Sequence, residues 1–205
     1  MFVFVIAVVM SAISISMAQQ SKATLKTFSI YKMSPSCVCI ATHRHTVSAD
    51  AKDLNVNGDI YQVFTSHDRQ RRELFRVRVG DSRSKWWNYG IVDEADFNAD
   101  GRSDYTWYGG DDTSSQMYVF LSTDSGYRRV DVLKTIAAAW TMQFHNAAPD
   151  FGSADSEYSL QIMRLGRTPD GMTLDAKIMH TDKHGGSKTA AVLRIAEANF
   201  QFVIG

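Results

Sequence analysis

Short segments of alternating or continuous apolar residues recur along most of the chain, and they indicate β-strands. In residues 74–79, three apolar side chains alternate with two arginines, which is the pattern of a strand that buries one face. Pairs such as Asn57-Gly58 and Ser125-Gly126 separate the segments and are typical of turns. The strands predicted in this way cover residues 25–33, 37–47, 60–65, 74–79, 105–108, 117–122, 127–133, 160–165, 172–180 and 189–203.

Two regions predict more than a single strand. Residues 160–165 and 172–180 flank the turn sequence Thr168-Pro169-Asp170-Gly171, which predicts a β-hairpin. In residues 132–144, apolar side chains recur near the helical period, yet the β-branched residues around Val132 suit a strand equally well. We therefore expect a strand to about residue 134 and then a short helix to about residue 145.

The expected fold class is mainly β. The pattern predicts an antiparallel β-domain with at most one or two short helices, built as an open or barrel-like sheet or as a partial propeller-blade array. Residues 19–205 are enough for one domain with a hydrophobic core but short for two. The formal net charge of +0 argues against a nucleic-acid-binding protein and against a disordered acidic chain.

Residues 1–18 differ from the rest of the chain because they contain no charged residue and carry an apolar run from Phe2 to Met10. Ser16-Met17-Ala18 then supplies the small residues of a cleavage site. We interpret this segment as a signal peptide, so we expect a secreted, periplasmic or extracellular protein without a membrane span after cleavage. An uncleaved membrane anchor is the alternative, because the usual positive segment is missing.

Residues 96–104 carry the strongest chemical signal. Oxygen-bearing side chains stand at the first, third, fifth and ninth positions, and Gly101 stands at the sixth, where calcium loops turn sharply. Three carboxylates so close together repel one another unless a cation neutralises them. The predicted calcium ligands are the side chains of Asp96, Asn98, Asp100 and Asp104 and the backbone carbonyl of Arg102.

A metal-free turn is the alternative for this loop, because Asp and Asn also favour turns by bonding their own backbone. The loop is not an EF-hand, since its twelfth position is Trp107 instead of a bidentate Glu, and the residues that follow alternate like a strand. Calcium would therefore bind in a loop that runs into a β-strand.

Asp96 to Trp107, followed by the apolar residues 117–122 and Gly126-Tyr127, resembles an FG-GAP/VCBS-type repeat. In that family a D-x-N-x-D-G-x-x-D loop precedes a Tyr- and Leu-rich strand, a second strand and a Gly-containing turn. The resemblance covers about residues 90–133. It implies a calcium-stabilised β-module of surface or secreted proteins, often a propeller blade.

Residues 53–61 place Asp, Asn, Asn and Gly at the same first, third, fifth and sixth positions as the main loop. The two loops are separated by a distance that is common among repeat proteins. The ninth position is Tyr61, so the set of ligands is incomplete. Two interpretations stay open: a degenerate second copy of the calcium loop, and a hairpin turn at Asn57-Gly58.

Cys37, Cys39, His43 and His45 would share one face of a strand. At about 3.3 Å per residue the outermost two would lie about 26 Å apart, which is too far for one zinc ion. Ordinary half-buried strand positions are therefore favoured, and the disulfide state of the two cysteines stays open.

Two surfaces are candidates for binding. Arg76 and Arg78 would point outward from one strand and could meet an anionic polymer, although a solvated strand face has the same pattern. Trp86-Trp87 and Trp107-Tyr108 could stack on a sugar, although clustered aromatic residues more often belong to a core.

No catalytic motif is found in the sequence. Four polar residues lie close together in the sequence, and without a nucleophile they are only a weak signal for catalysis: His145, Asp150, Asp155 and Glu157. The favoured function is a secreted calcium-binding β-domain with a structural or adhesive role towards a glycan or polyanion. The alternative is a small secreted or periplasmic enzyme, acting on glycans, in which calcium is structural.

Overall fold

The structure is a computed structural model that describes residues 26–34, 37–41, 48–86, 88–111, 114–149, 151 and 157–204. The predicted signal peptide lies outside the described residues. The elements in chain order are β1 (Lys26–Ser34), β2 (Cys37–Ala41), β3 (Ala49–Val56), β4 (Asp59–Ser66), β5 (Glu73–Asp81), β6 (Asn88–Ala95), β7 (Asp104–Gly110), β8 (Ser115–Thr123), β9 (Gly126–Asp131), α1 (Val132–Phe144), β10 (Tyr158–Thr168), β11 (Gly171–Thr181), β12 (Ser187–Ala196) and the 3-10 helix η1 (Glu197–Asn199).

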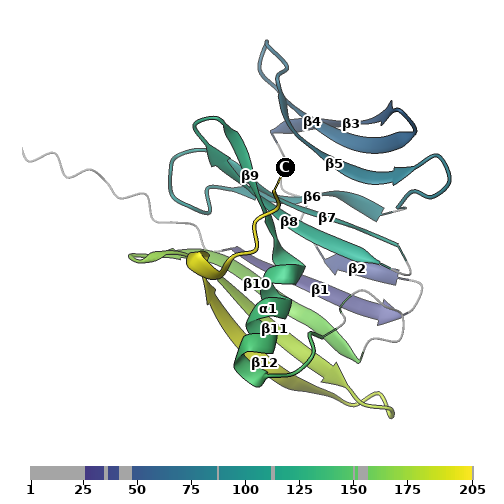
Figure 1. The fold of residues 1–205 in the computed structure, drawn as a ribbon, viewed down its shortest axis with the longest axis vertical. Helices are drawn as coiled ribbons and strands as arrows, with labels where there is room; N and C mark the ends of the chain where they lie inside the picture. The colour runs from purple at the N-terminus through teal and green to yellow at the C-terminus, as the bar shows by residue number, and fades with distance from the viewer. Residues whose placement is uncertain are drawn as a thin grey trace, which may run out of the picture.

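These strands form three open antiparallel sheets (Figure 1). The order is β12-β11-β10-β1-β2 in the five-stranded sheet, β3-β4-β5 in the three-stranded sheet and β6-β7-β8-β9 in the four-stranded sheet. All neighbouring strands pair antiparallel. The mainly β, antiparallel fold class with one α-helix is therefore confirmed.

The four-stranded sheet is the middle layer, because both of its faces are buried against different partners. Side chains alternate along β8: Tyr118 and Phe120 pack against the three-stranded sheet, whereas Val119 and Leu121 pack towards α1 and the five-stranded sheet. Burial on both faces explains why β7 and β8 read as nearly continuous apolar runs in the sequence.

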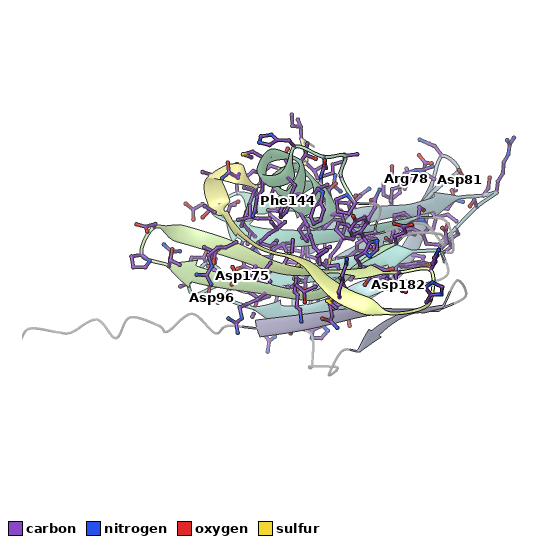
Figure 2. All side chains as sticks on the ribbon, turned by 90° about the horizontal axis from the view of Figure 1, so that it is seen from below. Arg78, Asp81, Asp96, Phe144, Asp175 and Asp182 are labelled. Carbon is purple, nitrogen blue, oxygen red and sulfur yellow. The ribbon has the colours of Figure 1, made fainter. Side chains whose placement is uncertain are left out.

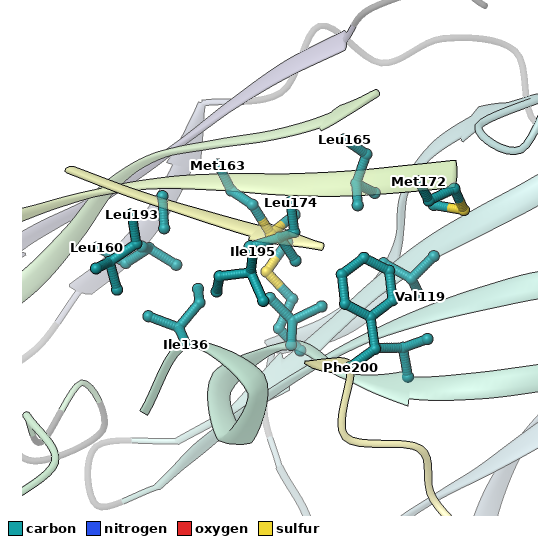
Figure 3. Close-up of a cluster of buried hydrophobic side chains, with 14 of the residues drawn as sticks. Val119, Ile136, Leu160, Met163, Leu165, Met172, Leu174, Leu193, Ile195 and Phe200 are labelled. Atoms are coloured by element: carbon teal, nitrogen blue, oxygen red, sulfur yellow. The ribbon is translucent and has the colours of Figure 1, made fainter. Parts of the chain in front are cut away.

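Helix α1 completes the core between the four- and five-stranded sheets. Val132, Ile136 and Trp140 follow the helical spacing and are buried, and Figure 3 shows Ile136 among side chains of the five-stranded sheet. The predicted strand to residue 134 is wrong, because the Asp131 side chain accepts the Lys134 N–H at 3.0 Å and caps a helix there. In the part of the chain that the structure describes, no helix is long and apolar enough to cross a membrane.

The chain ends differently from the predicted strand at residues 189–203. β12 ends at Ala196, and after η1 the chain crosses to the outer edge of β9. There the Asp131 N–H donates to the Gln201 carbonyl at 2.8 Å, and the Val203 N–H donates to the Arg129 carbonyl at 2.9 Å. The C-terminal segment therefore covers part of an edge strand whose backbone groups would otherwise be free to pair elsewhere.

Two of the predicted turns, at Asn57-Gly58 and Pro169-Asp170, are hairpin turns. The Pro169-Asp170 turn joins β10 to β11 with Thr168 paired to Gly171, as predicted. Asn57 and Gly58 join β3 to β4 and have φ of 54° and 94°, the left-handed values that a two-residue hairpin turn requires. The Asn-Gly alternative for residues 53–61 is therefore confirmed, and Asp53 lies in the middle of β3, paired with Gln62.

β11 and β12 are joined by an ion pair whose strength depends on pH. Arg194 donates to both carboxylate oxygens of Asp175, at 2.8 and 2.9 Å. This hydrogen bonding lowers the pKa of Asp175, although burial acts in the opposite direction. Because the pKa is lower in the folded state, the pair stabilises the fold above the unfolded pKa of 3.8, and the stabilisation is lost as the pH falls through the folded pKa.

We expect Asp175→Asn to lower the free energy of unfolding at pH 7 by no more than about 1 kcal/mol, because Arg194 is largely exposed. The difference from wild type should shrink towards zero at about pH 2. Urea titrations of both proteins at the two pH values measure it. An equal difference at both would show that the ion pair does not cause the effect.

Candidate metal centre

The loop of residues 96–103 joins β6 to β7 and is anchored in the core. Phe97 is fully buried, so the loop is fixed near its start. Ala99 and Gly101 have φ of 58° and 82°. The glycine therefore stands where the left-handed conformation is needed, as the sequence predicted.

The first three predicted ligands fold around backbone amides of their own loop. The Asp96 carboxylate accepts the N–H groups of Asp100 at 3.0 Å and Gly101 at 2.8 Å. Asn98 Oδ1 also accepts the Asp100 N–H, at 3.1 Å, and Asp100 Oδ1 accepts the Arg102 N–H at 2.9 Å. These bonds hold the three side chains against one turn of the loop, and the Asp100 carboxylate also accepts the Ser122 hydroxyl and the Arg102 guanidinium.

Asp104 is fully buried and ties the loop to β8. Its Oδ2 accepts the N–H groups of Phe97 at 2.8 Å and Asn98 at 3.3 Å. Its Oδ1 accepts the Ser122 N–H at 2.7 Å and the Ser122 hydroxyl at 3.0 Å. Burial raises the pKa of Asp104, and the hydrogen bonds act against that rise. The side chain is therefore a structural centre of the loop.

Arg102 acts through its side chain, which the sequence analysis did not predict. Its guanidinium donates to Asp100 Oδ2, at 2.9 Å from Nη2, and to Asp124 at 2.8 Å. Burial raises the pKa of Asp100, but hydrogen bonds from Arg102, Asn98 and Ser122 together outweigh it and leave the pKa below its usual value. Those same partners, Asp124 first and then Asp100, raise the pKa of Arg102. A positive charge therefore already lies on the loop.

The loop fits a calcium ion in part. The donor types suit calcium, and the side chains of Asp96, Asn98 and Asp100 are held on one turn. Among the residues that the structure describes, however, no three His, Cys, Asp or Glu side chains form a group that could hold a metal ion. Asp104 is committed to four donors, which suits the ninth position of a calcium loop, where the ligand often acts through a water molecule.

Three residues around the loop were not found from the sequence. Ser122 bridges Asp100 and Asp104 through its hydroxyl group. Asp124 follows β8 and holds Arg102, and Arg167 of β10 donates to the Asn98 carbonyl. The pairing of Tyr105 with Phe120 places Ser122 beside the loop, so the register of the β7–β8 hairpin is the signal that leads to it.

The arginines that point outward from β5 are paired with acids. Arg76 donates to Glu73 at 2.6 and 2.7 Å, and Arg78 donates to Asp59 at 2.9 Å and to Asp81 at 3.4 Å. Figure 2 shows Arg78 and Asp81 together, well apart from Asp96. This strand face is therefore close to neutral, as in the solvated alternative.

The aromatic candidates are divided between core and surface. Trp107 is fully buried and donates its Nε1–H to Gln62 at 2.8 Å, so it cannot stack on a ligand. Tyr108 is buried on the opposite face of the sheet. Trp86 is half-buried beside Trp107, at 5.9 Å between ring centroids, and Trp87 lies outside the described residues. Only Trp86 of the described candidates reaches the surface.

An open groove of about 540 Å³ lies between the three-stranded and four-stranded sheets. We call it the intersheet groove. Trp86 lines it together with Tyr118, Val77, Val79 and Gly80, and polar and charged residues complete it: Arg78, Asp81, Ser84, Asp111, Ser114, Gln116 and Arg129. Its volume is in the range of ligand sites, which are usually 300–1,000 Å³.

Of the remaining candidates, the structure describes His145, Glu157, Cys37 and Cys39. His145 ends α1 in a left-handed conformation with φ of 54°, and Asp150 and Asp155 lie outside the described residues. Glu157 instead meets His180 at 3.2 Å, a pair that the sequence did not suggest. Cys37 and Cys39 lie on β2, whereas His43 and His45 are outside the described residues.

Comparison of the chain with protein-family models, with curated proteins and with solved structures gave no match. The resemblance to FG-GAP/VCBS-type repeats therefore rests on the residues of the loop and the two strands that follow it.

Proposed function

We propose that the protein is an exported, non-catalytic β-domain that binds calcium at residues 96–104 and has a structural or adhesive role towards a glycan or anionic polymer. The observation that carries the proposal is the arrangement of Asp96, Asn98 and Asp100, whose oxygens are fixed on one turn by four backbone N–H bonds. Preorganised oxygen ligands lower the cost of binding a cation, because little chain entropy is lost when it arrives.

The contacts of the Arg102 side chain are a second observation that supports a cation site. Its guanidinium donates to Asp100 Oδ2, so the loop already accepts a positive charge at one of the predicted ligands. Calcium would compete with this side chain for Asp100, because both need the same oxygen. The backbone carbonyl of Arg102 would stay available as a ligand, as the sequence predicts.

The Asp81 carboxylate at the intersheet groove lacks the property that a catalytic acid needs. A glycoside hydrolase needs a general acid whose pKa is raised. The Asp81 carboxylate instead accepts the N–H groups of Arg83 at 2.8 Å and Ser84 at 3.0 Å, and these bonds keep its pKa below the usual value. A binding role agrees better with this arrangement.

Calorimetric titration of the mature protein with calcium tests the proposal, and the same titration of the Arg102→Gln variant tests whether Arg102 competes with the ion. We expect saturable binding to wild type and severalfold tighter binding to Arg102→Gln, because the variant removes the competing cation from Asp100. Lys134→Gln, which removes an exposed positive charge on α1, is the matched control and should bind like wild type.

Absence of calcium binding by both wild type and Arg102→Gln would identify the loop as a metal-free turn. Binding that the Arg102 substitution weakens would instead contradict the competition between its side chain and the ion.

A further inference from the structure

We propose that the intersheet groove binds an acidic sugar unit, a hexuronate residue of a polysaccharide, through the guanidinium of Arg129 and the ring of Trp86. The inference deepens the proposed function, since it rests on a glycan-binding role and names the site and the ligand class. It is independent of calcium, because the groove contains none of the predicted metal ligands.

Arg129 is the cation that a ligand can use. Arg78, the other arginine of the groove, is held by Asp59 and Asp81. The Arg129 guanidinium lies 4.8 Å from the centroid of the Tyr118 ring, and no carboxylate of a described residue lies within ion-pair distance of it. Its planar fork of N–H groups therefore remains available, and this fork matches a carboxylate.

The aromatic rings define the shape of the ligand. Trp86 and Tyr118 both line the groove and both pack against Trp107, at 5.9 and 5.6 Å between ring centroids. Tyr118 is buried and also contacts the Arg129 guanidinium, so the half-buried Trp86 is the ring that a ligand can reach. A ring that is held in place offers a firm apolar surface at a low entropic cost. A sugar ring can pack its C–H face on such a surface while its hydroxyl groups turn outward.

The rest of the lining is polar and suits hydroxyl groups. Ser84, Ser114 and Gln116 supply neutral donors and acceptors beside the two rings. The Trp86 Nε1–H donates to Ser114 Oγ at 3.3 Å, and the Tyr118 hydroxyl donates to Gln116 Oε1, so the rings and the polar groups form one connected surface. A ligand with many hydroxyl groups and one carboxylate matches this combination better than an apolar acid.

The test uses an α-linked galacturonate trisaccharide and its methyl ester, which has the same linkage but no charge. We expect the acid to bind wild-type protein in calorimetric titrations and to shift the Trp86 indole N–H resonance, whereas the ester binds at least about tenfold more weakly. Arg129→Gln should lose about ten- to a hundredfold in affinity for the acid, and Arg129→Lys should lose less.

Arg128→Gln is the matched control. Arg128 is the neighbouring arginine of β9, but it lies over the Phe202 ring and does not line the groove. This variant should bind like wild type. If Arg129→Gln is unstable in urea titrations, Gln116→Ala provides the second test. Gln116 is an exposed residue of the groove, so its replacement should also weaken binding of the acid.

Three results would each overturn the inference. The acid and the ester could bind with the same affinity, or the Arg128 and Arg129 variants could lose the same affinity for the acid. The third is that inorganic sulfate competes for the groove as strongly as the trisaccharide does. Titrations with calcium and with chelator separate it from the metal proposal. Binding of the trisaccharide under both conditions, without any binding of calcium, would support the groove and reject the metal site. Binding of calcium alone would reject the groove.

Discussion

Replacing Asp104 with alanine is expected to lower the free energy of unfolding by about 3–5 kcal/mol. The side chain is fully buried and accepts N–H groups of Phe97 and Ser122, together with the Ser122 hydroxyl. Alanine would leave these buried donors without an acceptor, and each unsatisfied group costs about 1–3 kcal/mol. The loss is limited because the buried carboxylate itself is costly, which is the reason its pKa is raised.

Urea unfolding at neutral pH measures the Asp104→Ala effect. Asp124→Ala is the control, because Asp124 also contacts the loop but its side chain is fully exposed. That variant should change the free energy of unfolding by no more than about 0.5 kcal/mol. Similar small effects for both variants would show that the loop does not depend on the buried carboxylate.

The strands of the core could be predicted from the sequence because buried strand positions are occupied by apolar residues, which recur in a recognisable pattern. β5 alternates because one face is buried, and β7 and β8 are continuous because both faces are. The pattern does not say which sheet covers which face. Tyr118 and Val119 are adjacent apolar residues, yet they belong to two different cores.

Two strands were not predicted, and each has a physical reason. β3 is exposed along almost its whole length, and the adjacent polar residues Lys52 and Asp53 interrupt its apolar alternation, so the tight turn at Asn57-Gly58 is the main sign that it pairs with β4. β6 contains Gly90 and a register shift between Ile91 and Asp93, which interrupts its alternation. Pairing with the neighbouring strands β4 and β7, and not local composition, makes these two segments strands.

The start of α1 illustrates a second limit. Val130 and Val132 suggested a continuous strand, whereas Asp131 between them is a helix cap. A single capping residue outweighs the preference of β-branched neighbours because it satisfies a free N–H at the helix start. Asp131, a residue type that favours the N-cap position, was the sequence signal for the boundary between β9 and α1.

The candidate metal loop was located by spacing, but its neighbours were not. Sequence spacing identified Asp96, Asn98 and Asp100, and the structure holds them on one turn. Ser122 and Asp124 come from the next hairpin, so they required the strand register. No spacing rule indicated that the Arg102 side chain would occupy Asp100.

Removing calcium from the protein is expected to lower the melting temperature by about 5–10 °C. An ion that binds only the native state stabilises it by about 2.7 kcal/mol at a hundredfold excess over Kd, and each kcal/mol corresponds to about 2–4 °C for a domain of this size. The ion would connect β6 to the start of β7 and offset the repulsion among the carboxylates of the loop.

Two variants show whether the loop is responsible for the response to chelator. Asp100→Ala should melt at a lower temperature in calcium and lose most of that response, because it removes the central ligand. Its bonds to Arg102 are lost under both conditions, so the difference between calcium and chelator isolates the ion. Asp53→Ala should keep the full response, since Asp53 lies on β3 and pairs with Lys85. A wild-type melting curve that is the same in calcium and in chelator would show that the loop closes through Arg102 alone.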